Sequence, residues 1–376
     1  MSTSNPNQTP ENQTILIGNV MADGEPVADV AVKFQDRPTY ISGPDGKFEY
    51  LAPAQGFTIE KIERPGYTLL SPALPFTAHG NESPVTILMK RDEGFSQRRT
   101  RKKAEDILET ALQFEKSGKI KEAAQLFINR SELDADNVRW LYETGLFFHK
   151  YKGYKTAQAF YNRAIKKAEE LYGEKNQWLA VCYEAYGDNY FKWNVYFESG
   201  MGDENNTLHF ADAKTYYQQA GHFWYTLLGE QNNHVAQIYH KMGKCWENLE
   251  NPTNAMKCYE NAMTIVNSGV VAPEVSATIH TDMGKCLHEK GEYEQALGHL
   301  EIACQTDRSL YGENSHKVFS DYLAIVSAQY DSRKLNEAMA TLEKLLLCTK
   351  ALYGEEHDMY QRVLHQIDLL KREMQR

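Results

Sequence analysis

Apolar residues recur every three or four positions through most of the chain, which is the period of an amphipathic helix. The pattern is clearest over residues 138–174. One stretch there carries Gly145 on its apolar side, and a second stretch, after a turn at residues 151–153, carries Ala157 and Tyr161 on its apolar side. Small residues on both stretches allow two helices to cross closely. The pattern therefore predicts a helix–turn–helix unit.

The small residue of the first helix returns at a regular spacing. Between residues 111 and 326 the steps are 34, 42, 56, 41 and 42. Glycine within a helix costs about 1 kcal/mol relative to alanine, so its return in one phase indicates a repeated close crossing. Self-similarity of this period predicts a repeat array. The first-helix positions are Ala111, Gly145, Gly187, Gly243, Gly284 and Val326; the second helices carry Ala123, Ala157, Ala213, Ala255, Ala296 and Ala338, followed four residues later by Phe127, Tyr161, Tyr217, Tyr259, Leu300 and Leu342.

A four-residue phrase, Leu-x-Gly-Glu, closes four of the helical stretches. Glycine in this position takes a positive φ and ends a helix, which leaves the next residues to start another. The copies are Leu171–Glu174, Leu227–Glu230, Leu310–Glu313 and Leu352–Glu355.

The string Gly145…Tyr154-x-x-Ala157-x-x-x-Tyr161-x-x-Ala164 resembles a tetratricopeptide repeat, a helix–turn–helix unit of about 34 residues. The steps near 42 and the Leu-Tyr-Gly-Glu endings resemble the longer, kinesin-light-chain-like form of this repeat. Six units cover residues 104–357, and the third is lengthened near residues 194–209. The resemblance implies an all-α solenoid in which the first helices line a concave groove. The first and sixth units depart from the pattern, with Arg130 and Leu345 at the last small position.

The apolar period changes from 3.6 to 2 over residues 13–91. The stretch from Val27 to Phe34 alternates, with Val30, Val32 and Phe34 on one face, and Asp-Gly turn signals separate the apolar stretches. Short strands divided by such turns predict a small antiparallel β-sandwich. The fold class is therefore a multidomain one, with this sandwich followed by the all-α solenoid.

The string Gly18-x-Val20…Asp45-Gly46-Lys47-Phe48…Gly66-Tyr67 resembles a carboxypeptidase-regulatory-like domain, which is a transthyretin-type sandwich. In that family the domain is an accessory with no catalytic group of its own. The His79-Gly-Asn-Glu82 string has the His-x-x-Glu spacing of a zinc carboxypeptidase ligand pair. A zinc enzyme needs three protein ligands around an open position, and no catalytic domain follows, so we interpret it as a polar loop.

Four segments lie outside these patterns. Residues 1–12 predict a disordered tail. Residues 92–103 predict a basic linker, with a nuclear signal or an anion-binding patch as alternatives. The insertion near residues 194–209 predicts a loop that either contributes to binding or is neutral. Residues 358–376 predict a C-terminal capping helix with one apolar and one polar side.

Composition narrows the class of function. The net charge of −10 argues against general nucleic-acid binding, and no apolar run reaches the roughly 18 residues of a membrane span. The start of the chain shows no signal-peptide pattern. The six cysteines fall within helical stretches and form no Cys-x-x-Cys pair, which predicts reduced core residues and disfavours zinc. We expect a cytoplasmic protein with no cofactor and no metal.

Candidate binding residues come from the stripe beside the core stripe of each first helix, which should face the groove. Lys244 and Lys285 hold the same phase one repeat apart, so together they could bind an acidic segment or a carboxylate terminus of a partner. An ordinary solvated surface is the alternative. The candidates are Arg139, Tyr142, His149, Glu184, Asp188, Phe191, Gln237, His240, Lys244, Thr281, Lys285 and His288.

No phosphate-binding loop, nucleophile elbow or isolated carboxylate pair is present in the sequence, so we predict no catalytic residues. The leading hypothesis is a non-catalytic adaptor or scaffold that binds a peptide or protein partner, possibly an acidic one, in the concave groove. The alternative hypothesis is a ligand- or peptide-responsive regulator within a larger complex. An enzyme is the third class, for which the sequence offers no candidate residues.

Overall fold

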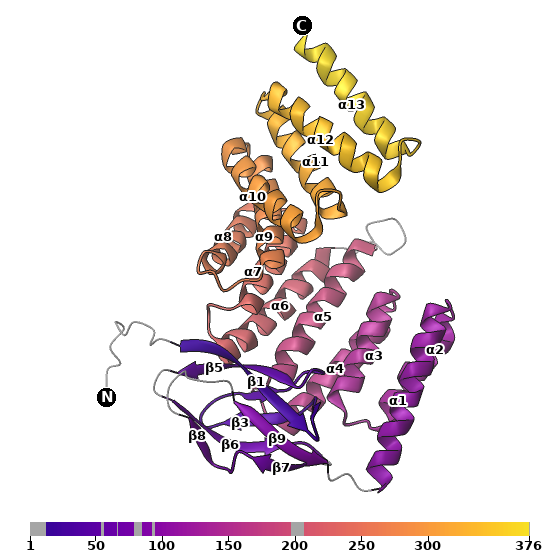
Figure 1. Cartoon of the computed structure of the whole chain (residues 1–376), viewed down its shortest axis with the longest axis vertical. Helices are drawn as coiled ribbons and strands as arrows, with labels where there is room; N and C mark the ends of the chain where they lie inside the picture. Colours follow the sequence, from indigo (N-terminus) through magenta and orange to yellow (C-terminus); the bar gives the residue numbers. More distant parts are fainter. Residues whose placement is uncertain are drawn as a thin grey trace. The chain divides into compact units, whose positions relative to one another are not determined.

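The computed structural model describes residues 13–53, 56–65, 67–78, 85–91, 95–196 and 207–375 (Figure 1). The predicted tail, the His79–Glu82 string and the centre of the insertion lie outside the described residues. The chain divides into two compact units, residues 1–230 and residues 231–376. The first unit holds the strands and six helices, and the second holds the remaining helices of the described residues.

Two sheets form the N-terminal region. One has the strand order β2-β1-β9-β7, with β5 also paired to β1, and the other has the order β4-β3-β6-β8. All pairs are antiparallel except β1 with β9, so the predicted antiparallel sandwich holds with one parallel pair. The strands are β1 (Gln13–Ala22), β2 (Glu25–Pro26), β3 (Ala31–Phe34), β4 (Thr39–Ile41), β5 (Lys47–Pro53), β6 (Phe57–Glu63), β7 (Tyr67–Ser71), β8 (Phe76–Ala78) and β9 (Thr86–Arg91).

Aromatic side chains fill the space between the two sheets. Phe34 lies 5.3 Å from the Tyr50 ring, 5.2 Å from the Phe57 ring and 5.1 Å from the Tyr40 ring, measured between ring centroids. The predicted inward positions Val30, Val32 and Phe34 are all buried. The alternation of apolar and polar residues therefore identified the core face of these strands correctly.

The rest of the described chain is helical, and consecutive helices pair as helix–turn–helix units, which confirms the predicted tetratricopeptide-like solenoid (Figure 1). The first helix begins at Phe95, so most of the segment that we predicted as a basic linker is helical. The helices are α1 (Phe95–Lys116), α2 (Ile120–Leu133), α3 (Val138–Lys150), α4 (Tyr154–Tyr172), α5 (Gln177–Tyr196), α6 (Thr207–Leu228), α7 (Asn233–Asn248), α8 (Pro252–Val266), α9 (Pro273–Glu289), α10 (Tyr293–Tyr311), α11 (His316–Asp331), α12 (Leu335–Tyr353) and α13 (Asp358–Met374).

The in-phase glycines are the points where the paired helices approach most closely. A Cβ atom would lie 2.5 Å from the Tyr161 side chain at Gly145, 2.6 Å from Tyr217 at Gly187 and 2.7 Å from Leu300 at Gly284, and it would clash in the same way with Tyr259 at Gly243. The nearest atoms come from the bulky second-helix residue four positions after the alanine, and at Gly284 the carbonyl of Ala296 also lies within 3.1 Å. The repeated crossing that we predicted is present, and a tyrosine ring or, at Gly284, the Leu300 side chain takes the space that a larger first-helix residue would need.

Helix ends follow the predicted turn chemistry. The glycines of the four Leu-x-Gly-Glu phrases all have φ between 78° and 84°, a conformation that costs glycine little and other residues more. Asn251 caps α8 by accepting a hydrogen bond from the Asn254 amide, with Pro252 in the first turn. Helix α5 ends at Tyr196 and α6 begins at Thr207, and residues 197–206 of the predicted insertion lie outside the described residues.

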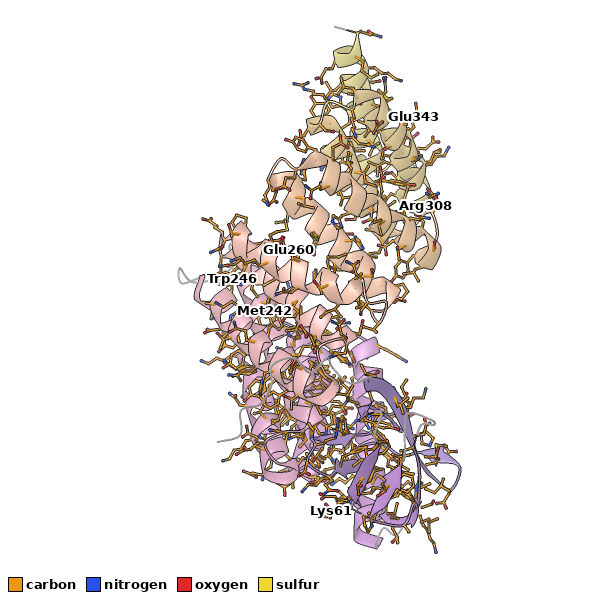
Figure 2. All side chains as sticks on the ribbon, turned by 90° about the vertical axis from the view of Figure 1, so that its left-hand side faces the viewer. Lys61, Met242, Trp246, Glu260, Arg308 and Glu343 are labelled. Carbon is orange, nitrogen blue, oxygen red and sulfur yellow. The ribbon has the colours of Figure 1, made fainter. Side chains whose placement is uncertain are left out.

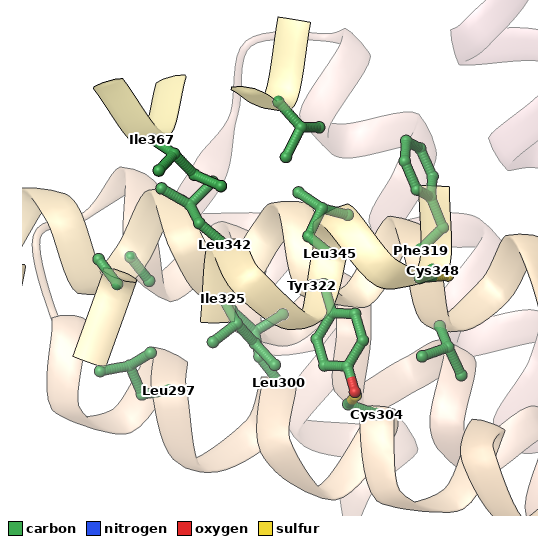
Figure 3. Close-up of a cluster of buried hydrophobic side chains, with 14 of the residues drawn as sticks. Leu297, Leu300, Cys304, Phe319, Tyr322, Ile325, Leu342, Leu345, Cys348 and Ile367 are labelled. Carbon is green, nitrogen blue, oxygen red and sulfur yellow. The ribbon is translucent and has the colours of Figure 1, made fainter. Parts of the chain in front are cut away.

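The largest apolar cluster of the second unit joins α10, α11, α12 and α13 (Figure 3). Leu345 of α12 is fully buried in this cluster, which also includes Tyr322 of α11 and Ile367 of α13. Helix α13 buries Val363, Ile367 and Leu370. Its remaining surface is mostly polar, which is the pattern that we predicted for a terminal cap.

The outer sides of the second helices carry charge. Glu260 of α8, Arg308 of α10 and Glu343 of α12 are exposed and point away from their helices (Figure 2). The six cysteines are buried and form no disulfide, in the helical interior where the sequence placed them.

Candidate functional site

The free edge of β4 docks on the loop between α4 and α5 within the first unit. The Thr39 amide donates to the Lys175 carbonyl at 2.9 Å, and Thr39 forms a parallel bridge with Asn176. Two residues on, the Ile41 amide donates to Oε1 of Gln177 at 3.0 Å. An exposed edge strand would offer unpaired amides to other chains, and here the repeats cover it.

The sandwich contacts two copies of the Leu-x-Gly-Glu phrase. The Tyr40 hydroxyl donates to the carbonyl of Leu227 at 2.7 Å, and Leu51 of β5 packs over Gly229. The Thr39 hydroxyl lies 3.4 Å from the carbonyl of Tyr172 in the earlier copy. Burial raises the pKa of Tyr40 to about 12, so its hydroxyl remains a donor across the physiological range. In the first unit the phrase therefore both ends a helix and supports the sandwich.

Replacing Tyr40 with phenylalanine should weaken this contact between the sandwich and the end of α6. The variant keeps the ring but leaves the buried carbonyl of Leu227 without its donor, which costs about 1 kcal/mol. Amide hydrogen exchange of β4 and of the α6 end should become faster, while exchange in α9 to α13 stays unchanged. Equal exchange in both proteins would show that this hydrogen bond does not hold the sandwich.

A chain of charges links the sandwich to the first repeats. Arg139 of α3 donates to Glu143 at 2.8 Å and lies 3.7 Å from Asp29, which follows β2. Arg130 of α2 donates to the other oxygen of Glu143 at 2.5 Å and is almost fully buried. Arg130 thus explains the departure of the first unit from the repeat pattern, because a small residue could not reach this carboxylate.

Asp29 is the strained member of the chain of charges. Its φ is 59°, its amide donates to the Ser42 carbonyl at 2.8 Å, and the Ser42 hydroxyl donates to the Val27 carbonyl at 2.7 Å. Burial raises the pKa of Asp29, and the positive charges of Arg139 and Arg64 oppose that rise. Non-glycine residues held at positive φ cluster at functional sites, where the surrounding structure pays for the strain.

A cavity of about 290 Å³ lies where the sandwich meets α3 and α5. Tyr142 and Trp178 form aromatic walls, with their ring centroids 5.6 Å apart. Burial raises the pKa of Tyr142, and the nearby anions add to that rise. Arg139 and Tyr142, two of the predicted groove residues, therefore line a pocket closed by the sandwich. The lining also includes Ile41, Pro44, Leu146, Val181, Gln177, Asp29 and Glu143.

The remaining candidates of the first unit contact other parts of the same unit. Nδ1 of His149 lies 3.2 Å from Oδ1 of Asn189 in the next first helix. Glu184 accepts from the indole of Trp224 at 3.0 Å, and Asp188 accepts from the Tyr217 hydroxyl at 2.7 Å. Phe191 packs edge-on against Phe210, with centroids 5.2 Å apart.

Asp282 of α9 organises the candidates at the start of the second unit. It lies 2.8 Å from Nε2 of His240, 3.7 Å from Lys244 and 3.6 Å from Lys285. Burial alone would raise the pKa of Asp282, but the hydrogen bond to His240 and the two lysine charges lower it to about 2. The two lysines that we proposed for an acidic partner thus surround a carboxylate of their own chain, and Lys244 also binds Glu247 at 2.6 Å.

Acidic residues of α11 bind the other candidates on α9. His288 lies 2.7 Å from Asp331, and the Thr281 hydroxyl lies 3.2 Å from Oδ1 of Asp321. Gln237, on α7, is partly buried. Both contacts join the first helix of one repeat, α9, to the first helix of the next, α11. The predicted binding stripe therefore also stabilises the packing of adjacent repeats.

An apolar groove of about 410 Å³ runs between α11 and α13 in the second unit. Leu323, Tyr330 and Leu369 line it and remain 37%, 41% and 49% exposed. Glu373 lies at its edge, where it accepts from the Tyr330 hydroxyl at 2.7 Å and from Arg333 at 2.8 Å. Neither Leu323 nor Tyr330 is among the binding candidates taken from the sequence.

Sequence reasoning missed Asp29 and Asp282. Asp282 lies two residues before Gly284 and three before Lys285, so its helix and its approximate face were readable, but its three partners were not. Asp29 offered no signal at all, because its role comes from the docking of the sandwich on α3. Among the residues that the structure describes, no three His, Cys, Asp or Glu side chains are grouped as a metal site.

No protein-family model and no curated protein matches the chain. Solved structures resemble it at low identity. BtubC (BKLC) from P. vanneervenii has 14% identity over 71% of this chain and 95% of its own, with a TM-score of 0.48. PilW, a type IV pilus biogenesis factor, has 11% identity over 69% and 98%, with a TM-score of 0.48. YrrB, a TPR protein with an unusual peptide-binding site, has 16% identity over 65% and 99%, with a TM-score of 0.40.

Over the described part of the chain, none of the helices combines the length and the apolar character that crossing a membrane requires.

Proposed function

We propose that this protein is a non-catalytic scaffold that binds a peptide or protein partner on the face formed by the first helices of its repeats. The observation that carries the proposal is the groove between α11 and α13, where Leu323, Tyr330 and Leu369 stay exposed. Exposed apolar side chains gathered in one groove mark an interaction site more often than a neutral surface. Lys285, with 46% of its side chain exposed, adds a cation on the same face for an acidic group of the partner.

The charged candidates support binding better than catalysis. Asp282 lies close to Lys244 and Lys285, and Glu143 binds Arg130 and Arg139, so both carboxylates are engaged by cations of their own unit. A general acid or base needs a pKa near the working pH and access to a substrate. The pKa of Asp282, lowered to about 2, does not meet the first condition, and Glu143 is held between two arginines.

The test is an affinity capture with the full-length chain as bait and a lysate of its source organism. The double variant Leu323→Asp/Leu369→Asp places charges in the groove and should lose the partners that the wild type retains. The matched control is Leu347→Asp on α12, where the leucine is 68% exposed and outside the groove. A partner list that is the same for all three proteins would contradict the groove assignment.

The sandwich supports a second function, a ligand-responsive regulator. Its β4 edge and Tyr40 bind two loops of the repeats, and a cavity lies at the joint. A ligand bound there would contact both parts and change the stability of their contact. We propose an accessory role for the sandwich, as its resemblance to a carboxypeptidase-regulatory-like domain implies. The six buried thiols support a reducing compartment such as the cytoplasm.

A further inference from the structure

The cavity between the sandwich, α3 and α5 has the features of a small-molecule site. Its volume of about 290 Å³ is at the lower end of the range for such sites, which runs from about 300 to 1,000 Å³. It lies at the junction of two parts of the fold, where ligand pockets are common. Four separate segments supply its walls, namely Asp29 after β2, the β4 end with its following turn, α3 and α5.

One side of the cavity is apolar and aromatic. Trp178 and Tyr142 provide ring faces, and Leu146, Val181 and Pro44 complete this side. Leu146 remains 38% exposed, so this side is reached from solvent. A bulky aliphatic or aromatic side chain would bury its surface here, at roughly 25 cal/mol per Å² of apolar area.

The other side carries both signs of charge. The guanidinium of Arg139 stands between the carboxylates of Asp29 and Glu143. Arg64 acts on Asp29 from outside the lining, and Arg130 holds the far oxygen of Glu143. Because the charges of this group nearly cancel, a ligand with a large net charge of either sign is disfavoured.

The loosest contact in this group is the 3.7 Å separation between Arg139 and Asp29, against 2.8 Å between Arg139 and Glu143. A carboxylate of the ligand can approach Arg139, which favours planar two-point contacts with such groups. An ammonium of the ligand can approach Asp29. Because the carboxylate of Asp29 and the guanidinium of Arg139 are neighbours, 3.7 Å apart, they can face the ammonium and the carboxylate of one α-amino acid.

From these walls we infer that the cavity binds a free α-amino acid with a bulky apolar side chain. Asp29 and Arg139 hold its ammonium and carboxylate groups, and Tyr142 and Trp178 hold its side chain. Because the bound amino acid contacts the sandwich and the repeats together, it clamps β4 to α3 and α5. This inference names the ligand class for the regulator function proposed above, and it does not depend on the groove between α11 and α13.

The experiment is isothermal titration of the full-length chain with L-leucine, L-phenylalanine and N-acetyl-L-leucinamide. The free amino acids should bind, and the blocked derivative, which lacks both charges, should bind more weakly by about tenfold or more. Amide exchange of residues 39–41 should slow when L-leucine is bound. No heat with either free amino acid, or equal binding of the blocked derivative, would overturn the inference.

Two variants locate the site. Leu146→Trp fills the cavity from its exposed side and leaves all the charged residues unchanged, and it should lose L-leucine binding while keeping its helical circular dichroism. Leu347→Trp adds the same ring to an exposed position of the second unit and should bind as the wild type does. Leucine binding that survives in Leu146→Trp would overturn the inference. Loss of partner capture by the groove variant with intact leucine binding, or the reverse, separates the two proposals.

Discussion

Gly243→Ala should destabilise the second unit by about 1–3 kcal/mol, although alanine favours helices more than glycine does. The added methyl group would collide with the ring of Tyr259, which is fully buried. The ring has no room to retreat, because Ala255, Cys286 and Leu287 pack around it. Its hydroxyl is also tied to Glu247 at 2.7 Å. Overpacking should therefore outweigh the gain in helix propensity.

The same substitution at Gly298 should change the stability in the opposite direction. Gly298 lies in the interior of α10, is exposed, and has no atom within 4 Å of the place where a Cβ would stand. Gly298→Ala should therefore stabilise the protein by up to about 1 kcal/mol through helix propensity alone. Urea unfolding of both variants, with amide exchange to assign the change to the second unit, measures the difference. Destabilisation of similar size at both positions would contradict the packing explanation.

A double variant tests the pairing directly. The sixth repeat uses Val326 and Leu342 at the equivalent positions, so a larger first-helix residue is compatible with leucine in the second helix. Tyr259→Leu should lose stability by itself, but combined with Gly243→Ala it should lose less than the two single changes together. A double-mutant cycle measures that coupling, and additive losses would show that the two positions do not interact.

Asp321→Asn should raise the stability of the second unit at neutral pH by roughly 3 kcal/mol. Asp321 is buried, and its pKa is raised to about 6 by burial and by the charge of Asp307, against the opposing effects of Thr281, Lys285 and Lys317. The pKa of Asp307 is raised as well, mainly by burial. Two buried carboxyl groups that face each other resist ionisation. Folding therefore becomes less favourable once the pH is high enough for the carboxyl to ionise in the unfolded chain.

The sign of the pH dependence follows from the direction of the shift. In the unfolded chain the pKa of Asp321 is near its ordinary value of 3.8, so the stability that this residue contributes is fully present below that pH. It is lost as the pH rises through about 6. The stability gained in Asp321→Asn should therefore appear between these two values and stay constant above them. Urea unfolding at a series of pH values checks this, and Asp331→Asn, at a carboxylate that is 44% exposed, is the control.

A histidine pair gives the wild type the opposite slope. His280 and His299 approach each other at 2.8 Å between their Nδ1 atoms, and burial followed by the charge of His299 lowers the pKa of His280 to about 4. Its contribution is present above its ordinary value of 6.5 and is lost as the pH falls toward 4. In Asp321→Asn the stability that His280 loses at acid pH is no longer offset by the opposite contribution of Asp321. A variant whose stability depends on pH as the wild type does would refute the role given to Asp321.

The repeat array was readable from the sequence because its physics is local. A helix crossing needs a small residue at one position and a bulky residue about 16 residues later, as Gly145 and Tyr161 show. The helix ends at Gly173 and Gly312 need a positive φ, which glycine alone adopts at low cost. The strands of the sandwich were readable for the same reason, through alternation at Val30, Val32 and Phe34.

The extent of the first helix was misjudged because the run from Arg98 to Lys103 has no apolar period, and its basic residues fit a linker as well as a helix. The helix nevertheless begins at Phe95. The candidate site shows the same limit. The stripe that holds Arg139, Tyr142 and Lys285 was found by phase, but phase does not tell which charge a side chain will meet.

By itself, the sequence determined the kinds of elements, their order and the faces on which they pack, since each depends on residues within one repeat or one hairpin. Only the tertiary structure decided that the β4 edge binds the α4–α5 loop, that Asp29 meets Arg139, and that Asp282 stands between Lys244 and Lys285. Most of these contacts join different elements, and Ile41 and Gln177 are 136 residues apart in the sequence. Their energy depends on burial and on the distance between charges. No periodic pattern along the chain encodes either quantity.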